Sequence, residues 1–409
     1  MVFIFLLVTS FCLRIDAQSS RDEGYNHLRQ GDNALAMGQW DIAIVHYTNA
    51  IQFDVTWADP LMKRANLLFR MGRVQEALLD YNKAMLINPY SEFIYDRRAK
   101  LKILASDLSG AQKDLDSLRS IGKTNLAVRE WLSEDFLLMK DYANAILELD
   151  TLQMLGEKNN TLKIRRAMIY VEWGHFSDAN TIMDSISGDQ SISALVNDLK
   201  GTIAAKRGDD QAALTYFSQA IRFMPGFAVS YFNRGMVYLK MGKHELAESD
   251  FKNAFSLSLD KSIVALMLGI TNLELGQQNE ALRKFDSAIL ENDTTGYLYF
   301  YRAQSKKMLG DYGGAFTDVN RSISLEPEKA SNYLLRGNIY LMFSDYREAI
   351  DDFSTAISLF PQYSEAYHNR GLAFIMDGRP QLGCSDLYRA LNLGYAFSEE
   401  MIKAFCQYR

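Results

Sequence analysis

The histidines and acidic residues of this 409-residue chain do not form a recognisable catalytic set. His244 and Glu245 begin like the helical zinc motif H-E-x-x-H, but the fifth residue of that stretch is Glu248, so the second zinc ligand is missing. The sequence contains neither a phosphate-binding loop of the type G-x-x-x-x-G-K nor a G-x-S-x-G nucleophile turn. The five histidines are expected to lie apart in the fold; they are His27, His46, His175, His244 and His368. We therefore expect no enzymatic activity, no metal and no cofactor.

The N-terminus has the features of an export signal. Residues 2–13 are almost entirely apolar, which is short for a membrane span of roughly 20 residues but typical of the core of a secretory signal. We expect a signal peptide over residues 1–17, cleaved after Ala17, and hence an exported protein, periplasmic or secreted, without a membrane span. An uncleaved membrane anchor is the alternative. Cleavage would remove Cys12 and leave two cysteines, Cys384 and Cys406, an even number for an oxidising compartment.

The charge of the chain argues against nucleic acid as a partner. Lys and Arg number 44 against 50 Asp and Glu, the net charge is −6, and no basic run occurs. Apolar residues make up 48% of the chain, which is typical of a folded protein rather than a disordered one. There are only six prolines, which favours a largely helical fold.

A spacing of 34 residues organises the whole chain. Five glycines follow it without interruption: Gly174, Gly208, Gly242, Gly276 and Gly310. Extending the spacing in both directions without insertions divides residues 24–397 into eleven repeats, in which we number the positions 1 to 34. The repeats are 24–57, 58–91, 92–125, 126–159, 160–193, 194–227, 228–261, 262–295, 296–329, 330–363 and 364–397.

Each repeat predicts two helices that pack closely against each other. Apolar residues recur at i, i+3, i+4 and i+7 in two stretches of every repeat. Position 8 is small in all eleven repeats, and position 20 is Ala in ten and Gly383 in the last, so the two helix backbones can approach closely. Position 15 is Gly in eight repeats, which is typical of the left-handed residue that ends a helix. Ser106, Lys140 and Ser344 replace this glycine, and we expect less tight turns there.

This pattern resembles the tetratricopeptide repeat family over residues 24–397. The residues that carry the resemblance are the small residue at position 8, Ala at position 20, an aromatic at position 24, Pro at position 32 and Tyr at position 11 (Tyr170, Tyr238 and Tyr340). The resemblance implies an all-α fold, a right-handed α-solenoid of about eleven helix-turn-helix repeats whose concave groove is formed mainly by the first helices. It also implies a non-catalytic scaffold that binds a protein or peptide.

Residues 398–409 are predicted to form a helix that caps the array, because a solenoid needs a cover for its apolar end. A turn near Gly394 would make this helix antiparallel to the last helix of the array and place Cys384 level with residues 405–406. We therefore predict a disulfide between Cys384 and Cys406; two buried thiols are the alternative. The C-terminal residues also resemble the tail of exported bacterial members of the family.

Two positions of the repeat, 7 and 23, often carry opposite charges. Position 7 is Arg in seven repeats, and six of these have Asp at position 23, which lies at the same height in an antiparallel helix pair. We predict an ion pair within most of these repeats, with two solvated charges as the alternative. The pairs are Arg64 with Asp80, Arg98 with Asp114, Arg234 with Asp250, Arg302 with Asp318, Arg336 with Asp352, and Arg370 with Asp386.

Repeats three to five, residues 92–193, depart from the pattern. Their aromatic residue at position 24 becomes Leu115, Leu149 or Met183, while the small residue at position 27 becomes a larger aliphatic one. Such an exchange keeps the core volume, so we expect one continuous solenoid; a domain break in this stretch is the alternative.

Positions 2, 5, 9 and 12 form one stripe on the first helix, which the resemblance places in the concave groove. In repeats one to four the stripe is mixed and rather acidic, and it contains Asp32, Asp59, Asp96, Glu130 and Glu134. Repeats seven to nine supply an apolar stripe: Val229, Phe232, Met236, Ile263, Leu266, Ile270, Tyr297 and Phe300. Exposed apolar surface of this kind often marks a binding site, so we predict that it holds an apolar or aromatic segment of a partner, as an extended peptide or a helix. The alternatives are that the superhelix buries the stripe against itself, or that its aromatics bind polysaccharide or cell-wall material.

Overall fold

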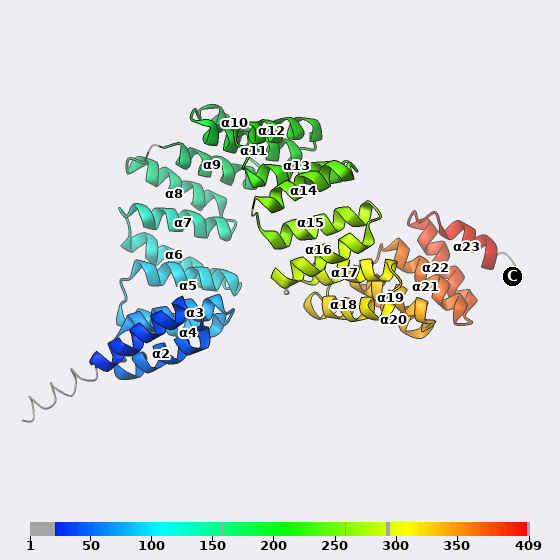
Figure 1. The fold of residues 1–409 in the computed structure, drawn as a ribbon, viewed down its shortest axis with the longest axis horizontal. Coiled ribbons are helices and arrows are strands. Elements are labelled where there is room, and N and C mark those ends of the chain that lie inside the picture. The colour runs from blue at the N-terminus through cyan, green and yellow to red at the C-terminus, as the bar shows by residue number, and fades with distance from the viewer. Residues whose placement is uncertain (1–20, 158, 258, 292–294, 407–409) are drawn as a thin grey trace, which may run out of the picture. The chain divides into compact units, whose positions relative to one another are not determined.

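The computed structural model describes residues 21–406 apart from 158, 258 and 292–294, and every regular element in these ranges is a helix (Figure 1). The predicted signal peptide, residues 1–17, lies outside the described residues. The chain divides into two compact parts at residues 187 and 188, within the fifth repeat. We call them the N-terminal block and the C-terminal block. Continuity of the solenoid across residues 187 and 188 stays a prediction.

The second helix of every repeat begins at position 17. These helices are α2 (Trp40–Phe53), α4 (Val74–Ile87), α6 (Leu108–Ile121), α8 (Tyr142–Met154), α10 (Phe176–Asp184), α12 (Asp210–Phe223), α14 (His244–Ser256), α16 (Gln278–Glu291), α18 (Tyr312–Leu325), α20 (Tyr346–Leu359) and α22 (Pro380–Asn392). The regular start follows from the turn before it, which has the same conformation in each repeat.

The first helices begin at or near position 1. A helix covers residues 21–36, and it is followed by α3 (Ala58–Arg70), α5 (Glu92–Leu104), α7 (Leu126–Leu138), α9 (Asn160–Trp173), α11 (Gln190–Lys206), α13 (Ala228–Lys240), α15 (Lys261–Glu274), α17 (Gly296–Met308), α19 (Ala330–Phe343) and α21 (Ser364–Met376). α11 starts four residues early because the Asp189 side chain accepts a hydrogen bond from the backbone N–H of Ile192 and caps the helix there. α23 (Ser398–Phe405) is the predicted capping helix.

Position 15 has a positive φ in all eleven repeats, including those without glycine. Ser106, Lys140 and Ser344 have φ of 62°, 59° and 63°. The next backbone N–H still closes onto the carbonyl five residues earlier, with 2.8 Å for Asp141 to Phe136, as it does after a glycine. The expectation of less tight turns was therefore wrong: the closing hydrogen bond keeps the left-handed conformation, at a cost of about 1 kcal/mol for a residue with a side chain.

The core is built on a match between positions 8 and 24. Position 20 is fully buried in the ten repeats that have Ala there, and the side chain at position 24 lies against position 8. A Cβ atom on Gly235 would lie 2.9 Å from the ring of Phe251, so no side chain fits beneath that ring. Four of the five repeats with an aliphatic residue at position 24 have Ala or Ser at position 8; the pairs are Leu115 with Ala99, Leu149 with Ser133, Met183 with Ala167 and Val319 with Ala303. The match has two exceptions, since the eleventh repeat pairs Leu387 with Gly371 and the second pairs Tyr81 with Ala65. The volume exchange predicted for repeats three to five therefore also involves position 8.

Within each block the helices pack in chain order, each on its neighbours. Consecutive helices are in contact throughout, and first helices of successive repeats also meet, as α15 meets α17 and α17 meets α19. Each block is thus a stack of helix pairs, which is an α-solenoid (Figure 1). The first helices together present one surface of the stack, and the stripe positions lie on them.

Candidate functional site

The predicted apolar stripe lies on α13, α15 and α17 of the C-terminal block, and none of its eight side chains is buried. Four are exposed, namely Val229, Met236, Ile263 and Tyr297, with 37–46% of their surface accessible. The other four are half-buried; they are Phe232, Leu266, Ile270 and Phe300. Burial of the stripe against the same solenoid therefore does not occur within the C-terminal block.

The half-buried aromatics of the stripe belong partly to the core. The ring of Phe232 lies 5.6 Å from that of Phe251, and Phe300 packs against a buried cluster that includes Val319 and Leu335. Both rings therefore contribute to stability as well as to the surface. The exposed members of the stripe are the ones that a partner can contact without any rearrangement.

Lys307 also lies on this face, although the sequence analysis did not single it out. It occupies position 12 of the ninth repeat, on the same helix as Tyr297 and Phe300. Its side chain is half-buried, and no described residue forms a hydrogen bond or an ion pair with it. Burial lowers the pKa of the Lys307 ammonium, and the charge of Glu365 opposes this shift.

In the N-terminal block the acidic groups of the stripe are mostly paired. Lys63 lies 2.8 Å from Asp32, Lys100 lies 2.8 Å from Asp96, and Arg165 lies 3.4 Å from Glu130. The acidic surface expected from the sequence is therefore largely neutralised by cations of the same block. The signal that could have shown this is the presence of Lys63 and Lys100 on or beside the stripe.

A buried aspartate lies beside this charged stretch. Asp135 is fully buried on α7, and neither carboxylate oxygen has a hydrogen-bond partner among the described residues. The Lys100 ammonium is 3.7 Å from it, too far for a hydrogen bond, and is closer to Asp96. Burial raises the pKa of Asp135 to about 8; the charge of Lys100 lowers it, and the charges of Asp96 and Glu134 raise it further.

The six predicted Arg–Asp pairs are all confirmed. In each, the guanidinium donates from Nε and Nη2 to the two carboxylate oxygens of an almost completely buried Asp, with 2.7 Å from Arg64 Nε to Asp80. The third nitrogen, Nη1, reaches position 25 of the preceding repeat at 2.7–3.1 Å; the acceptors are Thr48, Asn82, Ser218, Asp286, Asn320 and Ser354. Each Arg therefore joins the second helices of two successive repeats, a link that the sequence analysis missed.

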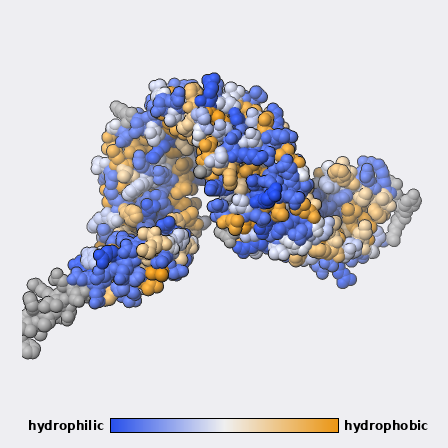
Figure 2. All heavy atoms as spheres, viewed as in Figure 1, coloured by the Kyte–Doolittle hydropathy of each residue, from blue (hydrophilic) through white to orange (hydrophobic). Residues whose placement is uncertain are grey.

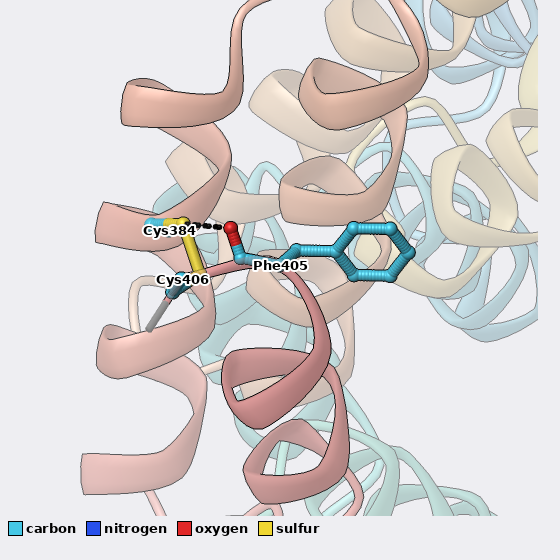
Figure 3. Close-up of a disulfide and its surroundings, with 3 residues drawn as sticks. All are labelled: Cys384, Phe405 and Cys406. Carbon is cyan, nitrogen blue, oxygen red and sulfur yellow. Dashed lines mark hydrogen bonds between the residues drawn. A yellow bond between two sulfur atoms is a disulfide. The ribbon is translucent and has the colours of Figure 1, made fainter. Parts of the chain in front are cut away.

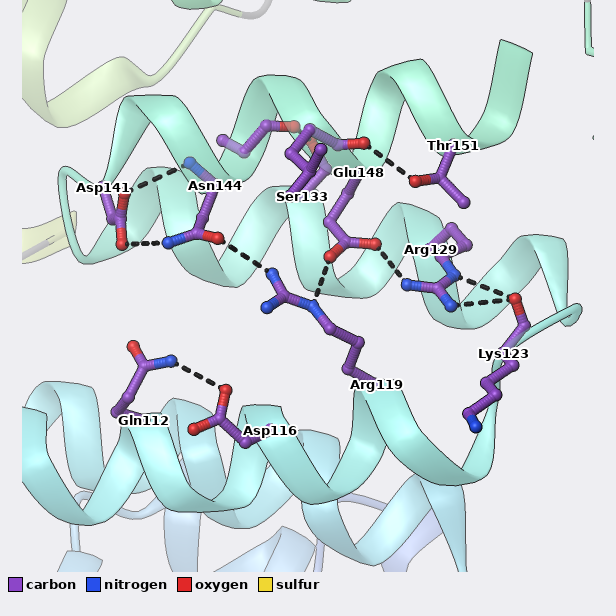
Figure 4. Close-up of polar contacts among 12 residues, drawn as sticks. Gln112, Asp116, Arg119, Lys123, Arg129, Ser133, Asp141, Asn144, Glu148 and Thr151 are labelled. Carbon is purple, nitrogen blue, oxygen red and sulfur yellow. Dashed lines mark hydrogen bonds and ion pairs between the residues drawn. The ribbon is translucent and has the colours of Figure 1, made fainter. Parts of the chain in front are cut away.

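The fourth repeat replaces this pair with a different network (Figure 4). Glu148 occupies position 23, and position 7 is Leu132. The buried Glu148 carboxylate accepts hydrogen bonds from Arg119 Nε at 2.6 Å and from Arg129 Nη1 at 2.7 Å. Arg129 is buried as well and donates to the backbone carbonyl of Lys123 at 2.8 Å. One carboxylate thus holds two arginines from two repeats, which is a structural role rather than a catalytic one.

Two of the five histidines meet, against expectation. His27 and His46 belong to the same first repeat, and their Nδ1 atoms lie 3.2 Å apart. Positions 4 and 23 of a helix pair lie opposite each other, which is the signal that could have shown this. Across the described ranges, however, no group of three or more His, Cys, Asp or Glu side chains suits a metal ion.

The C-terminal cap is held by two kinds of contact. A disulfide joins Cys384 of α22 to Cys406 at the end of α23 (Figure 3), which is the pairing that the sequence predicts. At the other end of α23, the buried Ser398 Oγ lies 2.9 Å from Nδ1 of His368 on α21. The cap is thus fixed to both helices of the last repeat.

Hydrophobic residues are not confined to the stripe. On the face drawn in Figure 2 they alternate with hydrophilic residues over both blocks, so a single exposed apolar residue does not mark a site. What distinguishes the stripe is the run of apolar side chains on three successive first helices. Within the described residues, no helix is both long enough and apolar enough to cross a bilayer.

Comparison with known sequences places these repeats in a family. Residues 228–261, which are the seventh repeat, match a sequence profile described as "Tetratricopeptide repeat", and residues 334–392 match a second profile of the same description. The human tetratricopeptide repeat protein 16 is 23% identical over 321 residues, covering 74% of this chain and 34% of the relative. The human DnaJ homolog subfamily C member 7 is 23% identical over 356 residues, covering 79% and 71%. The chain thus spans about a third of the length of the first of these relatives.

A solved structure shows a similar fold over nearly the whole chain. The APC/C hetero-tetramer Cut9-Hcn1 contains a chain that matches with a TM-score of 0.53 and 12% identity, covering 97% of this chain and 99% of that one. At this identity the likeness concerns the fold alone. The repeat spacing, the helix pairs and the matching profiles agree, and the chain is a tetratricopeptide repeat protein.

Proposed function

We propose that this chain is a non-catalytic scaffold that holds a peptide segment of a partner protein on the apolar stripe of its C-terminal block. The observation that carries the proposal is the exposure of Val229, Met236, Ile263 and Tyr297 on three successive first helices. Removing these apolar side chains from water on binding is favourable, at about 25 cal/mol per Å² of apolar surface. Met and Tyr are also among the residues enriched in protein interfaces.

Polysaccharide or cell-wall material fits the stripe less well than a peptide does. A sugar ring is usually held by an open aromatic face, and Tyr297 is the one aromatic side chain of the stripe that is exposed. Phe232 and Phe300 lean into the core and present only part of their rings. The stripe instead offers several aliphatic side chains, which match the apolar side chains of a peptide.

The test uses the exposed members of the stripe and a library of random 12-residue peptides displayed on phage. Peptides selected on the full chain are synthesised, and their dissociation constants are measured by calorimetry. Met236→Asp and Ile263→Asp are each expected to weaken binding by at least about tenfold, because a charge would be buried without a partner. At position 297 the variant is Tyr297→Ala, which removes the exposed ring without creating an ion pair with the adjacent Lys329, and it should also weaken binding. These positions are preferable to Phe232 and Phe300, whose replacement would also disturb the core.

Leu290→Asp is the matched control. Leu290 is an exposed apolar residue of the same block, but it lies on α16, a second helix. Its replacement should leave both the fold and the binding unchanged. Selected peptides that bind the three stripe variants as tightly as the original chain would refute the proposal, as would an equal loss in the Leu290 variant.

We further propose that the protein is exported and acts in the cell envelope or outside the cell. The apolar run over residues 2–13 and the disulfide between Cys384 and Cys406 support this proposal. Protein recovered from its native compartment should begin near Gln18 and show no titratable thiol after denaturation without reductant. Two titratable thiols, or a start well away from Gln18, would count against export with cleavage at this site.

A further inference from the structure

We propose that Lys307 makes the apolar stripe selective for peptide segments that carry a carboxylate beside their apolar residues. This inference rests on the proposed function, since it concerns the same surface. It adds a polar specificity determinant to a site that is otherwise apolar.

Lys307 shares the face of α17 that carries the stripe. An α-helix turns about 100° per residue, so Tyr297, Phe300 and Lys307 fall within about 80° of one another around the helix. α17 also contacts α15 on one side and α19 on the other. A segment lying along the stripe from α13 to α17 therefore reaches the Lys307 ammonium at its end.

The stripe has few charged groups in the C-terminal block. Positions 2, 5, 9 and 12 of repeats six to eleven contain three charged residues, which are Asp198, Lys307 and Glu365. Asp198 is buried, and it accepts hydrogen bonds from Ser230 at 2.7 Å and from Asn233 at 3.3 Å. Its oxygens are therefore occupied within the protein, which leaves Lys307 and Glu365 as the accessible charges at these four positions. Beside the stripe, the Lys329 ammonium lies 3.5 Å from the Tyr297 hydroxyl oxygen, so that cation is engaged by a stripe residue, whereas the Lys307 ammonium is not.

The ammonium of Lys307 has lost part of its hydration without gaining a partner. Its neighbour Lys306 is paired with Asp318 at 2.8 Å, whereas no described carboxylate lies within 4.0 Å of Lys307. Glu365 influences Lys307 only from beyond ion-pair distance. A partner carboxylate placed on Lys307 would supply the missing charge-assisted hydrogen bond in a setting where water screens it poorly. Such a contact discriminates between partners more than it adds affinity.

The experiment measures acid preference with the full chain and defined peptides. From the peptides selected on phage, matched pairs are made in which one acidic residue is Glu or Gln, each with a free or an amidated C-terminus. We expect the Glu peptide to bind roughly tenfold more tightly than the Gln peptide. An alternative result is that the chain prefers peptides with a free C-terminus over amidated ones and binds the Glu and Gln peptides equally well. That result would identify the peptide's C-terminal carboxylate, rather than a side chain, as the group that Lys307 binds.

Variants of Lys307 and Glu365 test how each charge affects the binding of acidic peptides. Lys307→Gln should remove the preference for the acidic peptide and leave the affinity of the neutral peptide unchanged. Glu365→Gln should increase the affinity of the acidic peptide a few-fold, because a like charge is removed. Lys252→Gln is the control, since it makes the same change in net charge at an exposed site on α14.

The outcomes distinguish this inference from the proposed function. Neutral and acidic peptides that bind equally well, with no effect of Lys307→Gln, would overturn the inference and leave the scaffold proposal intact. If Lys252→Gln lowers the preference for the acidic peptide as much as Lys307→Gln does, the preference comes from the overall positive charge, and this result would also overturn the inference. If the full chain selects no peptides at all, the proposed function fails and the inference fails with it.

Discussion

The two blocks use the same repeat in different ways. The C-terminal block has four Arg–Asp pairs of one design, and its stripe is apolar and exposed over three repeats. The N-terminal block has two such pairs and a rewired network around Glu148, and the acidic residues on its stripe are largely paired with cations of the same block. Most of the acidic stripe residues of the N-terminal block are paired with cations of that block, whereas the stripe of the C-terminal block exposes apolar side chains.

This difference suggests a division of labour between the two blocks. The Arg pairs of the C-terminal block lie between second helices, so they stabilise the stack without occupying the stripe. In the N-terminal block, Lys63 reaches from α3 to the helix over residues 21–36, and Arg165 reaches from α9 to α7. These contacts join first helices on the face where a partner would otherwise bind.

The largest expected effect tests the buried network of the N-terminal block. Glu148→Gln should lower the free energy of unfolding of this block by about 3–5 kcal/mol, because two arginines lose their shared counter-charge and Arg129 is buried. All four tryptophans lie in the N-terminal block, at positions 40, 57, 131 and 173, so fluorescence of the full chain reports on this block alone. Denaturant titration followed by fluorescence gives the measurement.

Asp250→Asn provides the comparison in the C-terminal block. Its partner Arg234 remains partly exposed and can be solvated, so the loss should be smaller, about 2 kcal/mol, and should appear in far-ultraviolet circular dichroism. The tryptophan signal should not shift. Equal losses for Glu148→Gln and Asp250→Asn would contradict the view that the two networks differ in how much charge they bury.

The repeat spacing predicted the fold closely because its physical causes are local. Small residues at positions 8 and 20 and the turn at position 15 recur in each repeat, and each determines the packing of a single helix pair. The Arg–Asp pairs were predictable for the same reason, since both partners lie in one repeat. The preference of glycine for a positive φ did not predict the conformation of Lys140. A hydrogen bond that closes the turn holds Lys140 in the left-handed conformation that glycine adopts at position 15 of other repeats.

Contacts between repeats were less predictable than contacts within them. The reach of Arg64 to Thr48, the pairing of Arg119 with Glu148 and the isolation of Asp135 all depend on how successive repeats stack. The eight apolar stripe residues lie on one face of the first helices, as predicted, because helical spacing places them there; their role in binding stays a prediction. Lys307 was missed because its significance comes from a missing counter-charge, which no spacing reveals.

A further prediction concerns the packing of position 8 against position 24 in the C-terminal block. Gly235→Ala should destabilise this block by up to about 3 kcal/mol, because the new methyl group would overlap the ring of Phe251. Adding Phe251→Leu should recover part of that loss, since the double variant reproduces the pairing of Ala99 with Leu115 in the third repeat. Circular dichroism of the full chain follows the loss, and the tryptophan fluorescence transition should stay in place. Strictly additive losses would show that positions 8 and 24 do not act as a pair.

The last prediction is a pH dependence of the stability of the N-terminal block. The folded-state pKa of Asp135, about 8, lies above the value of about 3.9 expected in the unfolded chain, so the folded block holds a proton that unfolding releases. The stability that this proton provides is complete below pH 4 and is lost as the pH rises through 8, with a decrease of about 2 kcal/mol between pH 6 and pH 8. Asp135→Asn keeps the shape without the titrating proton and should flatten this slope in the tryptophan-monitored transition. Glu134→Gln is the control: Glu134 is exposed and adjacent to Asp135, and its replacement should leave most of the pH dependence unchanged. A pH dependence that persists in the Asp135→Asn variant would assign the titration to another group.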